Sequence, residues 1–343
     1  MADKKDYRKE LAEKFLSVLE EKGLDWKKEW SGQGMTPVNV KSRKAYHGIN
    51  RFALMLTAMQ RGYKDPRWAT YLQVQEMGLR LKDARGQGVT VGFWHPYDTK
   101  ERRSLTWEEF NRLDEQIGER YILLCTYSTV FNGDLIPGLA PLPEPELHDV
   151  AIDELVDVVS ACMGVEILHD GGNRAFYRPG EDKIHLPEPG YFYNDYAYNS
   201  TALHELAHAT GAPHRLGRQQ GAMFGTEEYA YEELVAEISS CFMSTGLAIG
   251  QDTFHVDNHK AYVQSWIAAI REKPEMLGKA VMDAEKATAY MEHAAGLIPD
   301  REFEESMRAQ EEPDTEKKMG KEAATVKKEL TARKDQKAKG PKL

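Results

Sequence analysis

The segment that most constrains the fold is His204-Glu205-Leu206-Ala207-His208. On an α-helix, residues four apart lie one turn apart on one face, so both imidazoles would converge with Glu205 beside them. No helix breaker occurs from Tyr198 until Gly211, so a helix is expected here. A catalytic zinc site usually has three protein ligands and one open position. The chain must therefore fold so that a third ligand reaches this helix.

Glu233 is the predicted third ligand, and it lies in a second helical pattern downstream. Glu233 and Glu237 are four residues apart and would share one helix face. The same face carries small side chains, which allow a second helix to approach closely. They are Ala230, Ala236, Ser240 and Cys241. We expect Glu233 to bind the metal and Glu237 to orient His204.

His214 is the alternative third ligand. His204, Glu205, His208, Gly211 and His214 also fit the spacing H-E-x-x-H-x-x-G-x-x-H, in which the glycine turns the chain and the last histidine completes the site. We favour Glu233 because no Met-turn follows and because the paired carboxylates would otherwise have no role. His214 stays open at this point.

The expected cofactor is one Zn²⁺ ion, and the expected chemistry is peptide hydrolysis. Zinc lowers the pKa of its bound water to about 7. Glu205 would act as the general base and pass the proton to the leaving amine. Tyr229 and Tyr231 are candidate donors to the tetrahedral oxyanion, although tyrosines at helical spacing are more often packing residues.

A basic segment stands out in a chain whose net charge is −10. Residues 41–85 contain ten basic and three acidic residues, with tyrosine, phenylalanine and tryptophan between them. Basic side chains follow a phosphate backbone and aromatic faces stack on bases, as single-stranded nucleic acid binding requires. The alternative is a solvated basic face over an aromatic core.

The hydrophobic periodicity predicts an α+β protein of two domains. Helices are expected around Leu11–Leu19 and 52–59, ended by Gly23 and Gly62, and strands at 89–94 and 121–130. A second set comprises a helix over 150–163, short strands at 165–168, 175–177 and 183–186, and two helices around Trp266 and Val281. The expected boundaries are a nucleic-acid-binding domain at 1–131, a Pro-rich linker at 132–149, a zincin-like domain at 150–296 and a charged, disordered tail at 297–343.

The sequence predicts a cytoplasmic protein without a membrane partner. It contains no run of 18 apolar residues and no apolar stretch at its N-terminus. Its three cysteines are an odd number, widely spaced and in apolar surroundings. We interpret Cys125, Cys162 and Cys241 as buried free thiols in a reducing compartment.

These motifs together resemble the ArdC antirestriction family from about residue 5 to 295. They are Trp30, Pro37-Val38-Asn39, Tyr46-His47-Gly48-Ile49-Asn50, residues 66–73, Val130-Phe131-Asn132, residues 204–211 with Arg215-Leu216, and residues 232–237. The resemblance implies an N-terminal single-stranded-DNA-binding domain, a C-terminal zincin-like metallopeptidase domain, and a role in protecting incoming DNA of conjugative plasmids and other mobile elements. Ala209 departs from the family, which often has a large aromatic there.

The resemblance makes the basic segment the expected DNA surface. The predicted contacts are Lys41, Arg43, Lys44, Tyr46, Asn50, Arg51, Trp68 and Tyr71. One hypothesis is a DNA-tethered zinc protease that cleaves unidentified proteins met on single-stranded DNA, such as restriction or host-defence components. A second is a non-catalytic protein that coats single-stranded DNA and has a structural zincin domain. A third is a repair protease for proteins crosslinked to DNA.

Overall fold

The computed structural model describes most of the chain. The described residues are 7–23, 36–113, 120–141, 152–192, 195–218, 226–246 and 260–308. They form two compact units. The first contains the described residues up to Thr90 and from Thr129 to Arg308, and the second those of Val91–Ser128.

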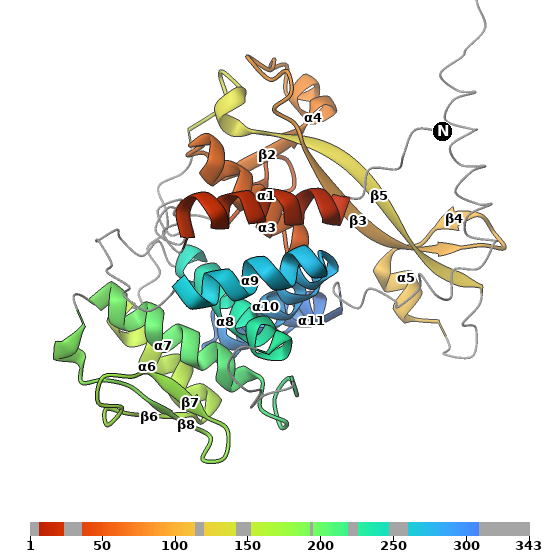
Figure 1. The fold of residues 1–343 in the computed structure, drawn as a ribbon. Coiled ribbons are helices and arrows are strands. Elements are labelled where there is room, and N and C mark those ends of the chain that lie inside the picture. Colours follow the sequence, from red (N-terminus) through yellow and green to blue (C-terminus); the bar gives the residue numbers. More distant parts are fainter. Residues whose placement is uncertain are drawn as a thin grey trace, which may run out of the picture. The chain divides into compact units, whose positions relative to one another are not determined.

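One apolar cluster of the first unit joins helices from both ends of the chain. It is formed by α1 (Tyr7–Lys22), α3 (Gly48–Arg61), α8 (Glu227–Gly246), α9 (Lys260–Glu272) and α10 (Glu275–Ala294) (Figure 1). Phe15 and Phe52 meet edge to face at 5.2 Å between ring centroids. The N-terminal helices α1 and α3 therefore share a core with the helices that follow the His204–His208 motif.

A second apolar cluster packs the motif helix against a small sheet. It contains α6 (Ile152–Met163), α7 (Asp195–Thr210), and residues of α8 and α10 such as Ala236 and Met291. The sheet has the order β6-β8-β7, with β6 and β8 parallel and β7 and β8 antiparallel. Its strands are β6 (Glu166–Leu168), β7 (Phe176–Arg178) and β8 (Lys183–His185), and the 3₁₀ helix η4 (Pro189–Tyr191) follows.

A five-stranded sheet of order β1-β2-β5-β3-β4 occupies the N-terminal part. Its strands are β1 (Val38–Asn39), β2 (Arg67–Thr70), β3 (Val89–Asp98), β4 (Arg103–Ser104) and β5 (Tyr121–Asn132). β3 and β5 run from the first unit into the second. In the first unit β2 pairs antiparallel with β5, and Trp68 lies opposite Asn132. Thr70 then starts α4 (Tyr71–Glu76) through a capping box with Gln73.

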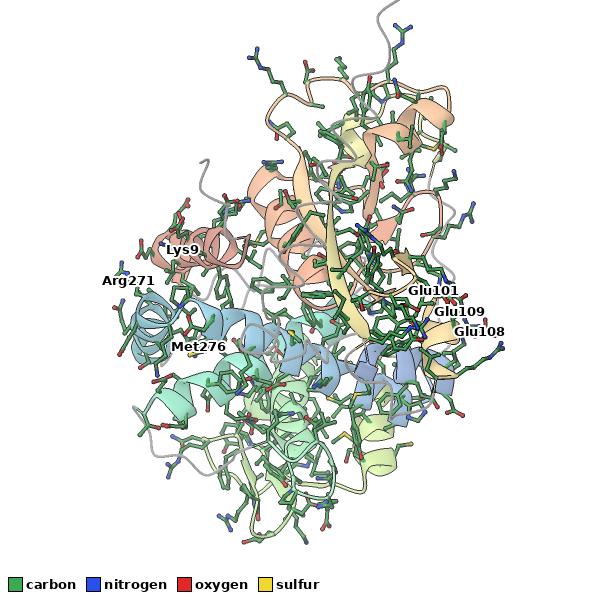
Figure 2. All side chains as sticks on the ribbon, turned by 90° about the vertical axis from the view of Figure 1, so that its right-hand side faces the viewer. Lys9, Glu101, Glu108, Glu109, Arg271 and Met276 are labelled. Carbon is green, nitrogen blue, oxygen red and sulfur yellow. The ribbon has the colours of Figure 1, made fainter. Side chains whose placement is uncertain are left out.

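The second unit is held by arginine–carboxylate pairs. Arg120 donates two hydrogen bonds to Asp98, at 3.0 and 2.6 Å, and these bonds lower the pKa of Asp98 to about 2. The short helix α5 (Trp107–Asn111) is capped by Thr106. Figure 2 shows Glu101, Glu108 and Glu109 near one another in this unit; arginines pair with all three. Acidic side chains thus accompany most of the arginines in the described part of this unit.

The α+β class and the predicted main elements are confirmed, but the ends of two segments differ. The start of the predicted linker is ordered, because β5 continues to Asn132 and the 3₁₀ helix η3 (Gly133–Leu135) follows. The start of the predicted tail forms α11 (Asp300–Arg308), where Phe303 stacks on His293. The remaining tail, 309–343, and linker residues 142–149 lie outside the described residues.

The cysteine prediction was wrong in part. No disulfide joins these three described cysteines, but Cys162 is exposed on α6 and Cys125 is half-buried, so Cys241 alone is buried among them. In the described ranges, no helix combines the length and apolar character needed to cross a bilayer.

The predicted domain boundary at residue 131 does not separate the two compact units that the structure forms. The shared cluster places α1 and α3 in one unit with α8 and α10. The reason is physical: the apolar faces of α1 and α3 are covered by helices that come from the other half of the chain.

Candidate metal centre and nucleic-acid surface

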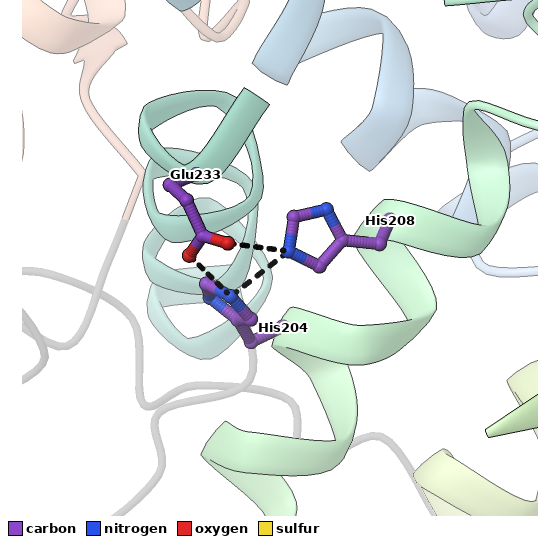
Figure 3. A group of neighbouring side chains, drawn as sticks. All are labelled: His204, His208 and Glu233. Carbon is purple, nitrogen blue, oxygen red and sulfur yellow. Dashed lines mark hydrogen bonds and ion pairs between the residues drawn. The ribbon is translucent and has the colours of Figure 1, made fainter. Parts of the chain in front are cut away.

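Two packed helices bring the predicted ligands together. His204 and His208 lie one turn apart on α7, and Glu233 projects toward them from α8 (Figure 3). One ligand atom from each residue lies within 4.8 Å of the others. The two Nε2 atoms are 3.2 Å apart. The Glu233 carboxylate lies 3.5 Å from His204 Nε2 and 3.8 Å from His208 Nε2.

These distances fit a small divalent cation. Tetrahedral zinc binds nitrogen and oxygen at about 2.0–2.2 Å, which places two ligand atoms about 3.3 Å apart. The three side chains are 17, 15 and 16 % exposed, so the group is reachable from solvent. In the part of the chain described by the structure, this is the one group of three or more such side chains within that range.

Carboxylates behind both imidazoles fix their orientation. Glu237 lies 2.9 Å from His204 Nδ1, and Glu232 lies 3.2 Å from His208 Nδ1. A carboxylate accepts a proton donated by Nδ1, so each Nε2 keeps its lone pair. Two lone pairs that face each other at 3.2 Å repel unless a cation lies between them.

A proton can take the cation's place when no metal is bound. Burial lowers the pKa of His204, but its hydrogen bonds to Glu233 and Glu237 outweigh burial and raise it to about 10. Burial raises the pKa of Glu233, but the two histidines outweigh it and lower the pKa to about 2. Metal binding at this group therefore displaces a proton.

Glu205 lies beside the three residues and is held by the sheet. It is buried, and its Oε2 accepts a 2.8 Å hydrogen bond from the backbone N–H of Tyr177. Tyr177 belongs to β7, one of the two edge strands of the small sheet. Its hydroxyl donates to Asp182, and Arg215 binds the same carboxylate through two nitrogens. These contacts fasten β7 to the end of α7.

The alternative ligand and one predicted oxyanion donor lie elsewhere. His214 is 62 % exposed, and its Nε2 lies 3.3 Å from Asp182. Tyr231 was a wrong candidate for the oxyanion, because its hydroxyl donates to Asp283 of α10 and its ring packs against the first cluster. Tyr229 lies one turn before Glu233 and hydrogen-bonds to its carboxylate.

Three predicted DNA contacts are buried, and the structure corrects them. Trp68 is 1 % exposed because β2 turns it into the core, where Tyr63 meets it edge to face. Tyr46 is 4 % exposed and shares a hydrogen bond with Asn39. Arg51 is 3 % exposed: it lies over the Phe242 ring and donates to the Phe242 carbonyl. Such side chains cannot reach DNA without unfolding.

The other predicted contacts remain at or near the surface. Lys41, Arg43 and Lys44 are exposed on a tight turn of residues 39–45, in which Arg43 adopts φ +57°. Asn39 accepts the backbone N–H of Lys41 and pairs with Gln73 of α4. The turn therefore lies beside α4, whose Tyr71 is 56 % exposed. Asn50 is half-buried.

Sequence reasoning missed two residues of the metal centre, Glu232 and Arg218. Glu232 adjoins Glu233, but on a helix the next residue points about 100° away, so its approach to His208 depends on how α7 and α8 cross. Arg218 follows the motif helix in a loop, and its two hydrogen bonds to Glu232 have no periodic signal.

Two family models match this chain. One, described as the N-terminal domain of anti-restriction factor ArdC, matches residues 5–131. The other, described as a zincin-like metallopeptidase, matches residues 154–283. The second range contains both helices of the metal centre.

Similar curated proteins include DNA primase TraC of Escherichia coli, 37 % identical over 303 residues, which cover 82 % of this chain and 27 % of that protein. Another TraC of Escherichia coli is 36 % identical. The chain spans about a quarter or less of these relatives' length. Protein y4eC of Sinorhizobium fredii is 30 % identical over 289 residues, 83 % of this chain and 91 % of that protein.

Two crystal structures of the antirestriction ArdC protein from plasmid R388 resemble this fold. The metal-free structure has a TM-score of 0.66 at 31 % identity, covering 86 % of this chain and 99 % of that chain. The Mn(II)-bound structure has a TM-score of 0.65 at 30 % identity, covering 86 % and 100 %.

Proposed function

This chain belongs to the ArdC family of antirestriction proteins, and from that premise we propose that it binds single-stranded DNA and hydrolyses peptide bonds at a divalent-metal centre. The single observation that carries the proposal is the convergence of His204, His208 and Glu233, with Glu205 beside them. We retain the prediction that it acts in the cytoplasm for a mobile element, on an unidentified protein such as a restriction or host-defence component.

The proposed ligands are His204, His208 and Glu233, with Glu237 orienting His204. One divalent ion is implied by the zincin-like domain, and the Mn(II)-bound R388 protein supports this. We propose Zn²⁺, because two imidazoles, one carboxylate and an open position are a common catalytic zinc set. The ion would supply a Lewis acid that acidifies water and polarises a carbonyl.

Glu205 performs the proton transfers in the proposed reaction. The Tyr177 amide holds Oε2, so Oε1 is the oxygen that takes the proton from the attacking water. Oε1 then returns this proton to the nitrogen of the leaving amine. Tyr229 holds the Glu233 carboxylate in place for the ion.

The proposed DNA surface consists of Lys41, Arg43, Lys44 and Tyr71, and we retain the half-buried Asn50 as a further proposed contact. The amino and guanidinium groups of the turn would pair with phosphates, and Tyr71 offers an exposed ring for one base. Lys41 bonds Glu76 at 2.6 Å, but an exposed pair of this kind contributes little and can exchange for a phosphate.

The test is protection of incoming DNA from restriction by wild type, Glu205→Gln, and a variant with Lys41, Arg43 and Lys44 each changed to Glu. Each protein is also measured for folding, metal content and single-stranded DNA affinity. We expect Glu205→Gln to keep metal and DNA affinity but lose protection. Full protection by Glu205→Gln would contradict the hydrolytic function and favour a protein that protects DNA by coating it.

A further inference from the structure

In the segment after α7, the buried side chain of Arg218 contacts the metal centre. Arg218 is 7 % exposed, and it donates from Nε to Glu232 Oε2 at 3.0 Å and from Nη2 to Glu232 Oε1 at 2.8 Å. This two-pronged contact fixes both the position and the plane of the carboxylate. Glu232 Oε1 is the atom that lies 3.2 Å from His208 Nδ1.

The same guanidinium also binds the last turn of α7. Nη1 donates to the Thr210 hydroxyl and Nη2 to the Ala207 carbonyl, each at 2.8 Å. The last carbonyls of a helix lack partners within it, and a cation there is favourable. Arg218 thus ties the end of α7, which carries His208, to the side chain on α8 that contacts His208.

Glu232 depends on this contact because it is buried. Only 8 % of Glu232 is exposed, and its carboxylate faces His208 Nδ1 and the Arg218 guanidinium. A buried carboxylate that loses its cation is costly, so it would turn toward water or distort the helix contact. Either change would release the His208 ring from its orientation.

We propose that Arg218 and Glu232 are positioning residues that aim His208 Nε2 at the metal. The inference rests on the metal centre of the proposed function and adds residues to it. His204 is aimed by Glu237 directly. His208 is aimed by Glu232, whose carboxylate Arg218 holds through two hydrogen bonds.

Arg215 offers a matched control. It too is buried, binds a carboxylate (Asp182) through two nitrogens, and donates to an α7 carbonyl (Ala209). Among the described residues, its hydrogen bonds go to Asp182, Ala209 and Met163, and none goes to Glu232 or to either histidine. Arg215→Met should therefore lower the melting temperature as Arg218→Met does, without changing the metal affinity of the folded protein.

The experiment measures Zn(II) affinity of the full chain by competition with a chromophoric chelator, and the visible spectrum of the Co(II) form. Arg218→Met should weaken Zn(II) binding about tenfold to a hundredfold, as expected for partners behind a ligand, and change the Co(II) bands. The Zn(II) affinity of Arg218→Lys should lie between those of wild type and Arg218→Met. Lysine keeps the positive charge but cannot donate two parallel hydrogen bonds to the carboxylate. The double variant Arg218→Met/Glu232→Gln should regain most of the affinity, because the amide still accepts from His208 and needs no cation.

Three results would overturn the inference. Arg218→Met could bind Zn(II) within about threefold of wild type, a change too small for a ligand-orienting contact. The double variant could bind Zn(II) no more tightly than Arg218→Met. The lower affinity would then come from disturbed packing and not from the unpaired charge of Glu232. Wild type could bind no Zn(II), or bind it equally well after His204→Ala; this result would reject the metal centre itself and the inference with it.

Discussion

At the residue scale, burial decides which aromatic and basic side chains can serve a partner. Trp68 and Tyr71 are three positions apart, yet one is 1 % and the other 56 % exposed. Trp68 points into the core from β2, whereas Tyr71 begins α4 after the Thr70 cap. Composition predicted a basic and aromatic surface, but it could not say which rings face solvent, and for Trp68, Tyr46 and Arg51 the prediction was wrong.

Substitution by alanine should affect stability at Trp68 and DNA binding at Tyr71. Trp68→Ala should lower the free energy of unfolding by about 3–5 kcal/mol, as for other large buried aromatics. Tyr71→Ala should leave stability nearly unchanged and weaken single-stranded DNA binding by about 1–3 kcal/mol, the usual contribution of one stacked base. Urea titration and fluorescence anisotropy measure the two effects. Unchanged DNA affinity in Tyr71→Ala would remove Tyr71 from the DNA surface.

At the element scale, a buried carboxylate of α10 caps the start of α3. Glu285 lies 2.8 Å from His47 Nδ1, accepts the backbone N–H of Gly48, and lies 3.5 Å from Arg51. A negative charge is favoured at a helix N-terminus. His47 has no capping hydrogen bond of its own, so the tertiary contact replaces a local cap. No sequence signal near residue 47 could predict this.

This cluster gives a pH dependence of stability through Glu292. Burial, together with Glu285 and Glu302, raises its pKa to about 7, although Arg51 and His47 oppose the rise. The folded state therefore holds a proton that the unfolded chain loses near pH 4.5, the ordinary value. The stabilisation is complete below about pH 4.5 and is lost as the pH rises to about 7.

Glu292→Gln isolates this contribution. The difference in unfolding free energy between the variant and wild type should grow between about pH 4.5 and 7 and then stay constant, because only wild type loses a proton there. Urea titrations at several pH values measure it. A difference that does not change with pH would show that Glu292 has its ordinary pKa.

At the scale of the whole molecule, the two parts of the chain that match separate family models share one hydrophobic core. The chain matches separate models for its two parts, but α1 and α3 pack with α8, α9 and α10. Local patterns predicted α1, α3, α6 and α7 well, because Gly23, Gly62 and the apolar spacing mark them. They could not predict the shared core or the pairing of β1 with β2, since both depend on contacts between distant residues.

The shared core predicts that the N-terminal part does not fold alone. A fragment of residues 1–131 would expose Phe15, Phe52 and Leu56, which are fully buried in the whole chain. We expect the fragment to lack a cooperative thermal transition, whereas the full chain should show one. Circular dichroism melts of both proteins measure this. A sharp transition in the fragment would establish an independent domain ending near residue 131.

The central claim is that His204, His208 and Glu233 hold one catalytic metal ion. X-ray absorption at the zinc edge, on the full chain loaded with one Zn²⁺, tests it most directly. The predicted spectrum contains two imidazole nitrogens and two oxygens at about 2.0–2.2 Å, one oxygen from Glu233 and one from water. His214→Ala should leave it unchanged, and Glu233→Ala should remove one oxygen. A third imidazole that disappears in His214→Ala would contradict the account and make His214 the ligand.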